Sequence, residues 1–134
     1  MLTLADVQRN PYINTFIQRS KEALSFYHYT DHGFDHVNLV AKRAKGLAKK
    51  IGLSNVEQEL CAIAGFCHDM GNFIDRIDHE YWGALLFFEV FKNKMPPKDL
   101  GLVMQAIANH DNYKAKVLSP ISAVLILADK SDVR

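Results

Sequence analysis

Hydrophobic residues recur along the chain at intervals of three, four and seven positions, the spacing that gathers side chains on one face of an α-helix. The sequence has neither a hairpin turn signal nor sustained alternation of apolar and polar residues, so we expect no strands. The pattern predicts an all-α protein, a single bundle of about six helices. The apolar positions of the first two predicted helices are Ile13, Phe16, Ile17, Leu24 and Tyr27, and then Val37, Val40, Ala41, Ala44, Leu47, Ala48 and Ile51.

Helix boundary signals divide the rest of the chain. Gly52 is expected to stop the second helix, and Ser54-Asn55-Val56-Glu57 forms a capping box for the third. Asp78 is expected to cap the fourth helix, Pro96-Pro97 to open the fifth and Ser119-Pro120 to open the sixth. The predicted core positions of the fourth and fifth helices are Tyr81, Trp82, Leu85, Phe87, Phe88 and Phe91, and then Leu100, Val103, Met104 and Ile107. The aromatic stretch at residues 26–29 is expected to pack at the end of the first helix.

Length and composition are those of one ordinary globular domain covering residues 1–134. With 49% hydrophobic and 23% charged residues and a net charge of +1, the chain gives no reason to expect a nucleic acid or a membrane as partner. Two cysteines in one apolar segment, Cys61 and Cys67, favour reduced core residues and a cytoplasmic location. The N-terminus does not resemble a signal peptide, and the longest apolar stretch uninterrupted by glycine, residues 123–128, is too short to cross a bilayer.

Two adjacent residues, His68 and Asp69, close the apolar run at residues 60–67 and stand directly before Met70-Gly71. A protein interior does not accept an imidazole and a carboxylate without partners. Gly71 is expected to turn the chain there, which would aim both side chains into one small space. An imidazole nitrogen beside a carboxylate oxygen is half of a metal site.

Other potential ligands fall at the ends of predicted helices. His36 opens the second helix, His79 opens the fourth, and His110 closes the fifth and is followed by Asp111. A single histidine at a helix end is more often a cap or a surface residue than a ligand. Asp129 is more informative, because it is expected well inside the apolar sixth helix, where a carboxylate needs a partner such as a metal ion.

The order His36, His68-Asp69, Asp129 resembles the HD-domain superfamily of metal-dependent phosphohydrolases. The neighbouring residues support the resemblance, which runs from about residue 32 to the end of the chain. They are His32-Gly33-Phe34-Asp35-His36-Val37, Phe66-Cys67-His68-Asp69-Met70-Gly71, Ile126-Leu127-Ala128-Asp129-Lys130, Asp78-His79 with Gly83-Ala84, and Asn109-His110-Asp111.

The resemblance implies a metal centre. His36, His68, Asp69 and Asp129 would bind a first ion, and Asp69 would bridge to a second ion held by His79 and His110. Imidazole and carboxylate ligands without thiolate favour one or two divalent ions of iron, manganese, zinc or cobalt, with magnesium as an alternative at one position. The predicted catalytic residues are His68, Asp69 and Asp129.

Two positions depart from many members of the family. Asn72 stands where they have a lysine, and Leu39 stands where they have an arginine, and both positions commonly help to hold substrate phosphates. Lys130 is one candidate phosphate contact in this chain. His32 is a second candidate, as a residue that orients a ligand or transfers a proton, although a loop histidine without a role fits equally well.

The resulting prediction is a metal-dependent hydrolase. It would cleave a phosphoester or phosphoanhydride of a nucleotide-like small molecule through a metal-activated water. Two alternatives stay open: a di-iron oxygenase that uses the same ligands, and a non-catalytic sensory or regulatory domain. The chain stops at Arg134, five residues after Asp129 and without a helix stop signal. We therefore expect either a fragment of a longer protein or a homo-oligomer in which a neighbouring subunit completes the site.

Overall fold

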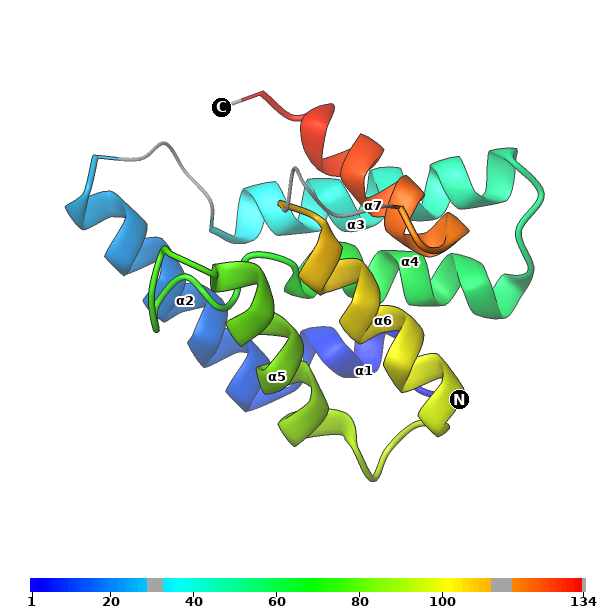
Figure 1. Ribbon diagram of the computed structural model, residues 1–134, viewed down its shortest axis with the longest axis horizontal. Helices are drawn as coiled ribbons and strands as arrows, with labels where there is room; N and C mark the ends of the chain where they lie inside the picture. Colours follow the sequence, from blue (N-terminus) through cyan, green and yellow to red (C-terminus); the bar gives the residue numbers. More distant parts are fainter. Residues whose placement is uncertain (29–32, 112–116, 134) are drawn as a thin grey trace.

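The computed structural model describes residues 1–28, 33–111 and 117–133, and the part of the chain that it describes contains helices and no strands. The fold prediction is therefore confirmed (Figure 1). The helices are α1 (Leu4–Gln8), α2 (Pro11–Phe26), α3 (Phe34–Lys50), α4 (Asn55–Cys67), α5 (His79–Phe91), α6 (Pro97–Asn109) and α7 (Pro120–Lys130).

The six predicted helices correspond to α2–α7, and the short helix α1 was not predicted. Thr3 begins α1 with a capping box that involves Asp6, and the helix buries Val7. A helix of five residues contains too few positions for a hydrophobic period to be recognised.

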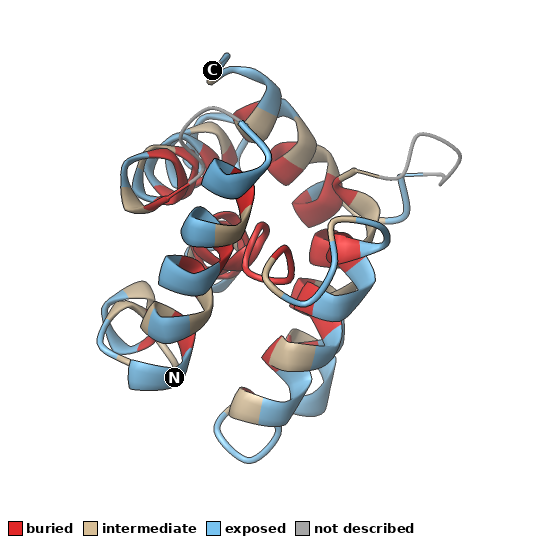
Figure 2. Cartoon of the chain, turned by 90° about the vertical axis from the view of Figure 1, so that its left-hand side faces the viewer, coloured by how far each residue is buried: buried red, intermediate tan, exposed pale blue. Residues whose placement is uncertain are grey.

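The long helices α3 and α4 pack side by side and form the centre of the fold. Gly65 of α4 allows their close approach, because a β-carbon there would lie 3.0 Å from the Cα atom of Ala41 in α3. α7 and α6 both pack on α4, and α5 packs on α6. Figure 2 shows that the buried stretches of these helices face one another across the interior. Among the described residues, no helix is both long enough and apolar enough to cross a membrane.

The predicted core positions of α5 were only partly correct. Tyr81, Trp82, Leu85 and Phe88 are 38–53% exposed, whereas Phe87 and Phe91 are buried. α5 is apolar on almost every side, so its sequence does not decide which side faces inward. In the structure the buried side is the one that carries His79, Gly83 and Phe87. The expected packing at the end of α2 was also wrong: Phe26 and Tyr27 lie mainly in solvent and contact each other edge to face.

Most helix boundaries agree with the prediction. Ser54 forms the capping box of α4, Ser119 caps α7, and Gly52 adopts the left-handed conformation (φ +86°) just beyond α3. Asp78 precedes α5 as expected but has a left-handed backbone (φ +60°), and its side chain makes no capping hydrogen bond.

A glycine is needed at position 71 because a neighbouring backbone leaves no room for a side chain. A left-handed turn is not the reason. The positive φ values of the described residues lie elsewhere, at His28, Gly52 and Asp78. A β-carbon on Gly71 would collide with the carbonyl oxygen of His79 and would lie 2.6 Å from the backbone nitrogen of Gly83. The turn after Asp69 therefore packs directly against the first turns of α5, and this contact brings His79 close to the His68–Asp69 pair.

Candidate metal centre

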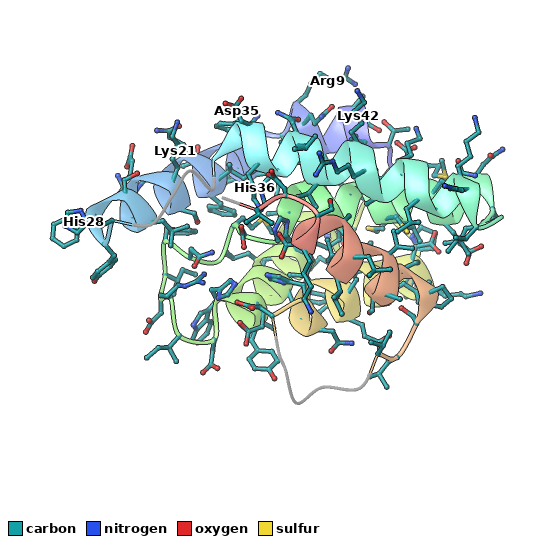
Figure 3. All side chains as sticks on the ribbon, turned by 90° about the horizontal axis from the view of Figure 1, so that it is seen from above. Arg9, Lys21, His28, Asp35, His36 and Lys42 are labelled. Atoms are coloured by element: carbon teal, nitrogen blue, oxygen red, sulfur yellow. The ribbon has the colours of Figure 1, made fainter. Side chains whose placement is uncertain are left out.

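Five helix ends meet in the interior and bring all six predicted ligand residues together. His36 lies in the first turn of α3, His68 is the C-cap of α4, His79 is the first residue of α5 and His110 is the C-cap of α6. Asp69 follows His68, and Asp129 lies near the end of α7. The four histidines and Asp69 are buried. In Figure 3, His36 points from α3 toward this centre, while its neighbour Asp35 points outward.

One group of ligand atoms lies between α3, α4 and α7. The Nε2 atoms of His36 and His68 are 3.3 Å apart. Asp129 Oδ1 lies 3.1 Å from the first of these nitrogens and 3.2 Å from the second. Asp69 Oδ2 lies 3.5 Å and 3.3 Å from the same two atoms. Both carboxylate oxygens therefore lie within 3.5 Å of the same two imidazole nitrogens.

A second group lies between α5 and α6 and uses the other oxygen of Asp69. The Nε2 atoms of His79 and His110 are 3.3 Å apart, and Asp69 Oδ1 lies 3.8 Å and 3.6 Å from them. Asp111 Oδ2 lies 3.4 Å from His79 Nε2, and Asp111 also forms a group of possible ligands with His79 and Glu80. The carboxylate of Asp69 thus joins the two groups, with one oxygen directed at each.

Each histidine is held by its other ring nitrogen. His68 Nδ1 donates to the carbonyl oxygen of Gly65 at 2.6 Å, and His110 Nδ1 donates to that of Ile107 at 2.6 Å. His79 Nδ1 donates to the carbonyl oxygen of Arg76 at 3.1 Å. A carbonyl oxygen only accepts, so in the neutral imidazole each Nε2 carries a lone pair that points inward. Histidine ligands of metals in proteins are held in this way.

His36 is held by a carboxylate from the far end of the chain. Its Nδ1 atom donates to Asp132 Oδ2 at 2.8 Å. Asp132 belongs to a segment that Arg43 of α3 binds, because the Arg43 guanidinium donates to the carbonyl oxygen of Ser131 at 2.8 Å and to its hydroxyl at 3.0 Å. The residues beyond α7 therefore pack back on α3.

The donor atoms suit metal ions. In each group two imidazole Nε2 atoms lie 3.3 Å apart, and when both imidazoles are neutral their lone pairs point at each other, so the two rings cannot hydrogen-bond to each other. Ligand atoms roughly 2.0–2.2 Å from a tetrahedral ion lie about 3.3–3.6 Å from one another. The nitrogen–nitrogen distance of 3.3 Å in each group is close to this value. Imidazole nitrogen with carboxylate oxygen is a ligand set for divalent transition metals.

The ionisation of the first group reflects the carboxylates around it. Burial lowers the pKa of His36, but Asp129 and Asp69 outweigh burial and raise the pKa to about 9. Burial also lowers the pKa of His68, but the charges of Asp69 and Asp129 raise it well above its usual value. Burial raises the pKa of Asp129, yet the two imidazoles hold it below its usual range. The same carboxylates would favour a metal cation in place of these protons.

The second group behaves differently. Burial and the neighbouring His110 imidazole lower the pKa of His79. An imidazole that stays neutral keeps its Nε2 lone pair, as a metal ligand must.

The position of Asp129 differs from the prediction. It is the penultimate residue of α7 and not an interior residue of that helix, and its side chain is 27% exposed. α7 ends at Lys130, where Ser131 is the C-cap and its hydroxyl donates to the carbonyl oxygen of Ala128 at 2.6 Å. The expectation of a helix without a stop was therefore also wrong. Lys130 is exposed, and His32 lies outside the described residues.

Sequence reasoning missed Asp111 and Asp132 as members of the site. Asp111 directly follows the C-cap of α6, so its place beside a predicted ligand was the available signal. Asp132 had no such signal, because it lies beyond the end of α7 and reaches His36 through tertiary packing, across 96 positions of the sequence.

Comparison with known protein families gives one result. The sequence model of the family described as HD domain matches residues 33–134 of the chain. The match covers about three quarters of the sequence and includes every residue of both ligand groups. Neither the curated proteins nor the solved structures contain a match.

Proposed function

The chain belongs to the HD-domain family, and from this premise we propose that it is a metal-dependent phosphohydrolase with a binuclear centre. The substrate would be a nucleotide-like phosphoester or phosphoanhydride. One observation carries the proposal: Asp69 directs one carboxylate oxygen at each of two separate groups of imidazole and carboxylate ligands. A single structural ion would not need a second set of ligands on the other oxygen of Asp69.

In this proposal each ion is held by two imidazoles and two carboxylates. Asp69 is shared between the groups. The remaining ligands of the first ion are His36, His68 and Asp129, and those of the second are His79, His110 and Asp111. A pair of divalent cations supplies an activated water and neutralises charge on the phosphoryl group.

The protein contributes orientation and controlled access. The hydrogen bonds from Nδ1 of His68, His79 and His110 to backbone carbonyl oxygens hold the imidazole planes before any ion binds. In the first group, Asp129 is the ligand whose side chain is most exposed, at 27%. Water and substrate would therefore approach past the end of α7, where the Asp129 carboxylate can accept a hydrogen bond from the attacking water.

The test is an assay of purified full-length chain loaded separately with manganese, iron, cobalt or zinc. We expect at least one metal to support release of phosphate, or of a phosphomonoester, from a panel of nucleotides and aryl phosphates. The rate should be the same in air and under nitrogen, because hydrolysis consumes no oxygen. Asp69→Ala should abolish release, whereas Asp35→Ala should not, since Asp35 is exposed on the outer side of α3.

Two outcomes would overturn the proposal. One is a metal-loaded protein that binds two ions and releases no phosphate from any member of the panel. The other is turnover that requires oxygen, which would favour a di-iron oxygenase on the same ligands.

A further inference from the structure

A cavity of about 560 Å³ lies beside the metal centre, between the end of α2 and the turn that follows Asp69. This volume lies within the usual range of small-molecule sites, roughly 300–1,000 Å³. Its lining residues are Ala23, Tyr27, Asn72, Phe73, Ile74, Asp75 and Arg76. None of them belongs to the two ligand groups, so the cavity is distinct from the centre itself.

The two walls of the cavity are fixed to each other. The Ser20 hydroxyl of α2 donates to the carbonyl oxygen of Met70 at 3.0 Å, and the Ser20 Oγ atom accepts from the backbone N–H of Phe73 at 3.0 Å. The rings of Phe16 and Phe73 stack with centroids 5.3 Å apart. Because a buried serine and an aromatic pair join α2 to the turn, the cavity exists before a ligand enters.

Arg76 links the cavity to the metal centre. Its Nη1 donates to Asn72 Oδ1 at 2.8 Å, and Asn72 Nδ2 donates to the carbonyl oxygen of Asp69 at 2.9 Å. Its Nη2 lies 4.0 Å from Asp111 Oδ2, the carboxylate oxygen that also approaches His79. The guanidinium thus stands between the cavity and the second ligand group. With five N–H donors it can contact Asn72 and an anionic oxygen at the same time.

The cavity lining indicates the ligand. The cavity has one guanidinium and one carboxylate, Asp75, so it suits a ligand with a single phosphate group and disfavours a long polyphosphate. Asp75 Oδ1 already accepts from the backbone N–H of Ile77 at 3.0 Å, and a carboxylate in this position can also accept from a sugar hydroxyl. Tyr27, Phe73 and Ile74 supply apolar surface, with the Tyr27 ring as a face for stacking.

We propose that this cavity binds the organic part of the substrate, a nucleoside monophosphate ester, with Arg76 on its phosphate and Tyr27 against its base. The inference rests on the proposed phosphohydrolase, because the phosphate would lie between Arg76 and the second ligand group. Asn72 acts as a positioning residue for the guanidinium, and Arg76 determines specificity for a phosphate at this end of the site.

The test measures binding separately from turnover. Metal-loaded full-length protein is titrated calorimetrically with three probes that it cannot hydrolyse. They are adenosine 5′-methylenephosphonate, in which a methylene replaces the ester oxygen, methylphosphonate and adenosine. Arg76→Gln should weaken the binding of both phosphonates by about tenfold, because one charged hydrogen-bond pair is lost, and should leave the affinity for adenosine unchanged. Tyr27→Ala should weaken the binding of both adenosine compounds by about fivefold or more and leave the affinity for methylphosphonate unchanged.

Matched variants separate this effect from a loss of fold or metal. Arg19→Gln removes the same charge from an exposed position of α2, where Arg19 pairs with Glu22, and should bind all three probes as the wild type does. Arg76→Lys keeps the charge without the planar fork and should fall between wild type and Arg76→Gln. Metal content is measured for every variant, and affinities are compared at equal occupancy.

Unchanged phosphonate binding in Arg76→Gln would overturn the inference, as would equal losses for all probes in Tyr27→Ala. The proposed function would survive such results if the protein still releases phosphate. Conversely, a protein that binds the phosphonates through Arg76 but hydrolyses no phosphoester would refute the proposed function and leave the cavity assignment in place.

Discussion

The Nδ1 atom of His36 donates to the carboxylate of Asp132 at 2.8 Å, so a residue beyond the last helix fixes the first imidazole of the site. The substitution Asp132→Ala should weaken metal binding at the first ligand group by about 10–100-fold, because the His36 imidazole loses the carboxylate that orients it. Titration with metal, followed by elemental analysis, measures the change. Asp132→Asn, which retains an acceptor oxygen, should recover part of the affinity. Wild-type affinity in Asp132→Ala would show that the contact does not support the ligand.

His68 is expected to be indispensable for metal binding. His68→Ala removes an inward Nε2 atom that lies 3.3 Å from His36 Nε2, so purified protein should lose the ion of the first group even where circular dichroism shows an intact fold. His28→Ala is the control, because His28 is exposed at the end of α2 and points away from the centre (Figure 3). It should keep full metal content. Full occupancy in His68→Ala would contradict the proposed centre.

The two ligand groups should be separable by mutation. Asp111→Ala removes the oxygen 3.4 Å from His79 Nε2 and should lower the metal content from about two ions per chain to about one. Asp129→Asn should instead weaken binding at the first group, since an amide is a poor ligand for a divalent cation. Metal removal should lower the melting temperature of the wild type more than that of either variant. Equal losses of both ions in both variants would contradict two distinct groups.

Gly71 should be the glycine least tolerant of substitution near the site. Gly71→Ala places a β-carbon against the carbonyl oxygen of His79 and 2.6 Å from the nitrogen of Gly83, so we expect a loss of roughly 3 kcal/mol in the free energy of unfolding. Gly46→Ala is the matched control. Its β-carbon would meet no atom within 4 Å, and alanine should stabilise α3 by about 0.5–1 kcal/mol. Chemical denaturation followed by circular dichroism measures both values. Equal stability of the two variants would show that the turn can move.

The two cysteines should be chemically silent in the native protein. Both side chains are fully buried, and burial raises the pKa of Cys61 to about 12 and that of Cys67 above its usual value. The reactive thiolate is therefore scarce in mildly alkaline buffer. A thiol reagent should label neither residue until a denaturant is added, and should then label both. Rapid labelling of the native protein, followed by mass spectrometry, would show that α4 opens.

The sequence was sufficient to predict helices α2–α7 and six of the candidate ligands because both follow local rules. The order of residues alone predicts a helix that ends on a polar pair, as α4 does at His68 and Asp69. Amphipathic helices with one apolar face, such as α3, also place their buried residues where the spacing predicts.

The remaining features depend on tertiary contacts that leave no local signal. α5 is apolar nearly all round, so packing against α6 and the turn at Gly71 decides that Trp82 faces solvent while Phe87 faces the core. The hydrogen bond between Asp132 and His36 joins positions 96 residues apart, and no periodicity connects them. The cavity at Arg76 likewise needs α2 beside the turn, which the Ser20 hydroxyl secures.

The shared carboxylate of Asp69 has a thermodynamic consequence. In the proposed binuclear centre, an ion held at one oxygen of Asp69 would withdraw electron density from the carboxylate and fix its plane, so it would alter the affinity of the other oxygen for a second ion. The two loading steps are therefore linked. Linkage is reciprocal: the factor by which an ion in the first group would change the affinity of the second group equals the factor by which an ion in the second group would change the affinity of the first. In such a centre Asp69 would make metal loading a coupled equilibrium, whichever ion arrived first.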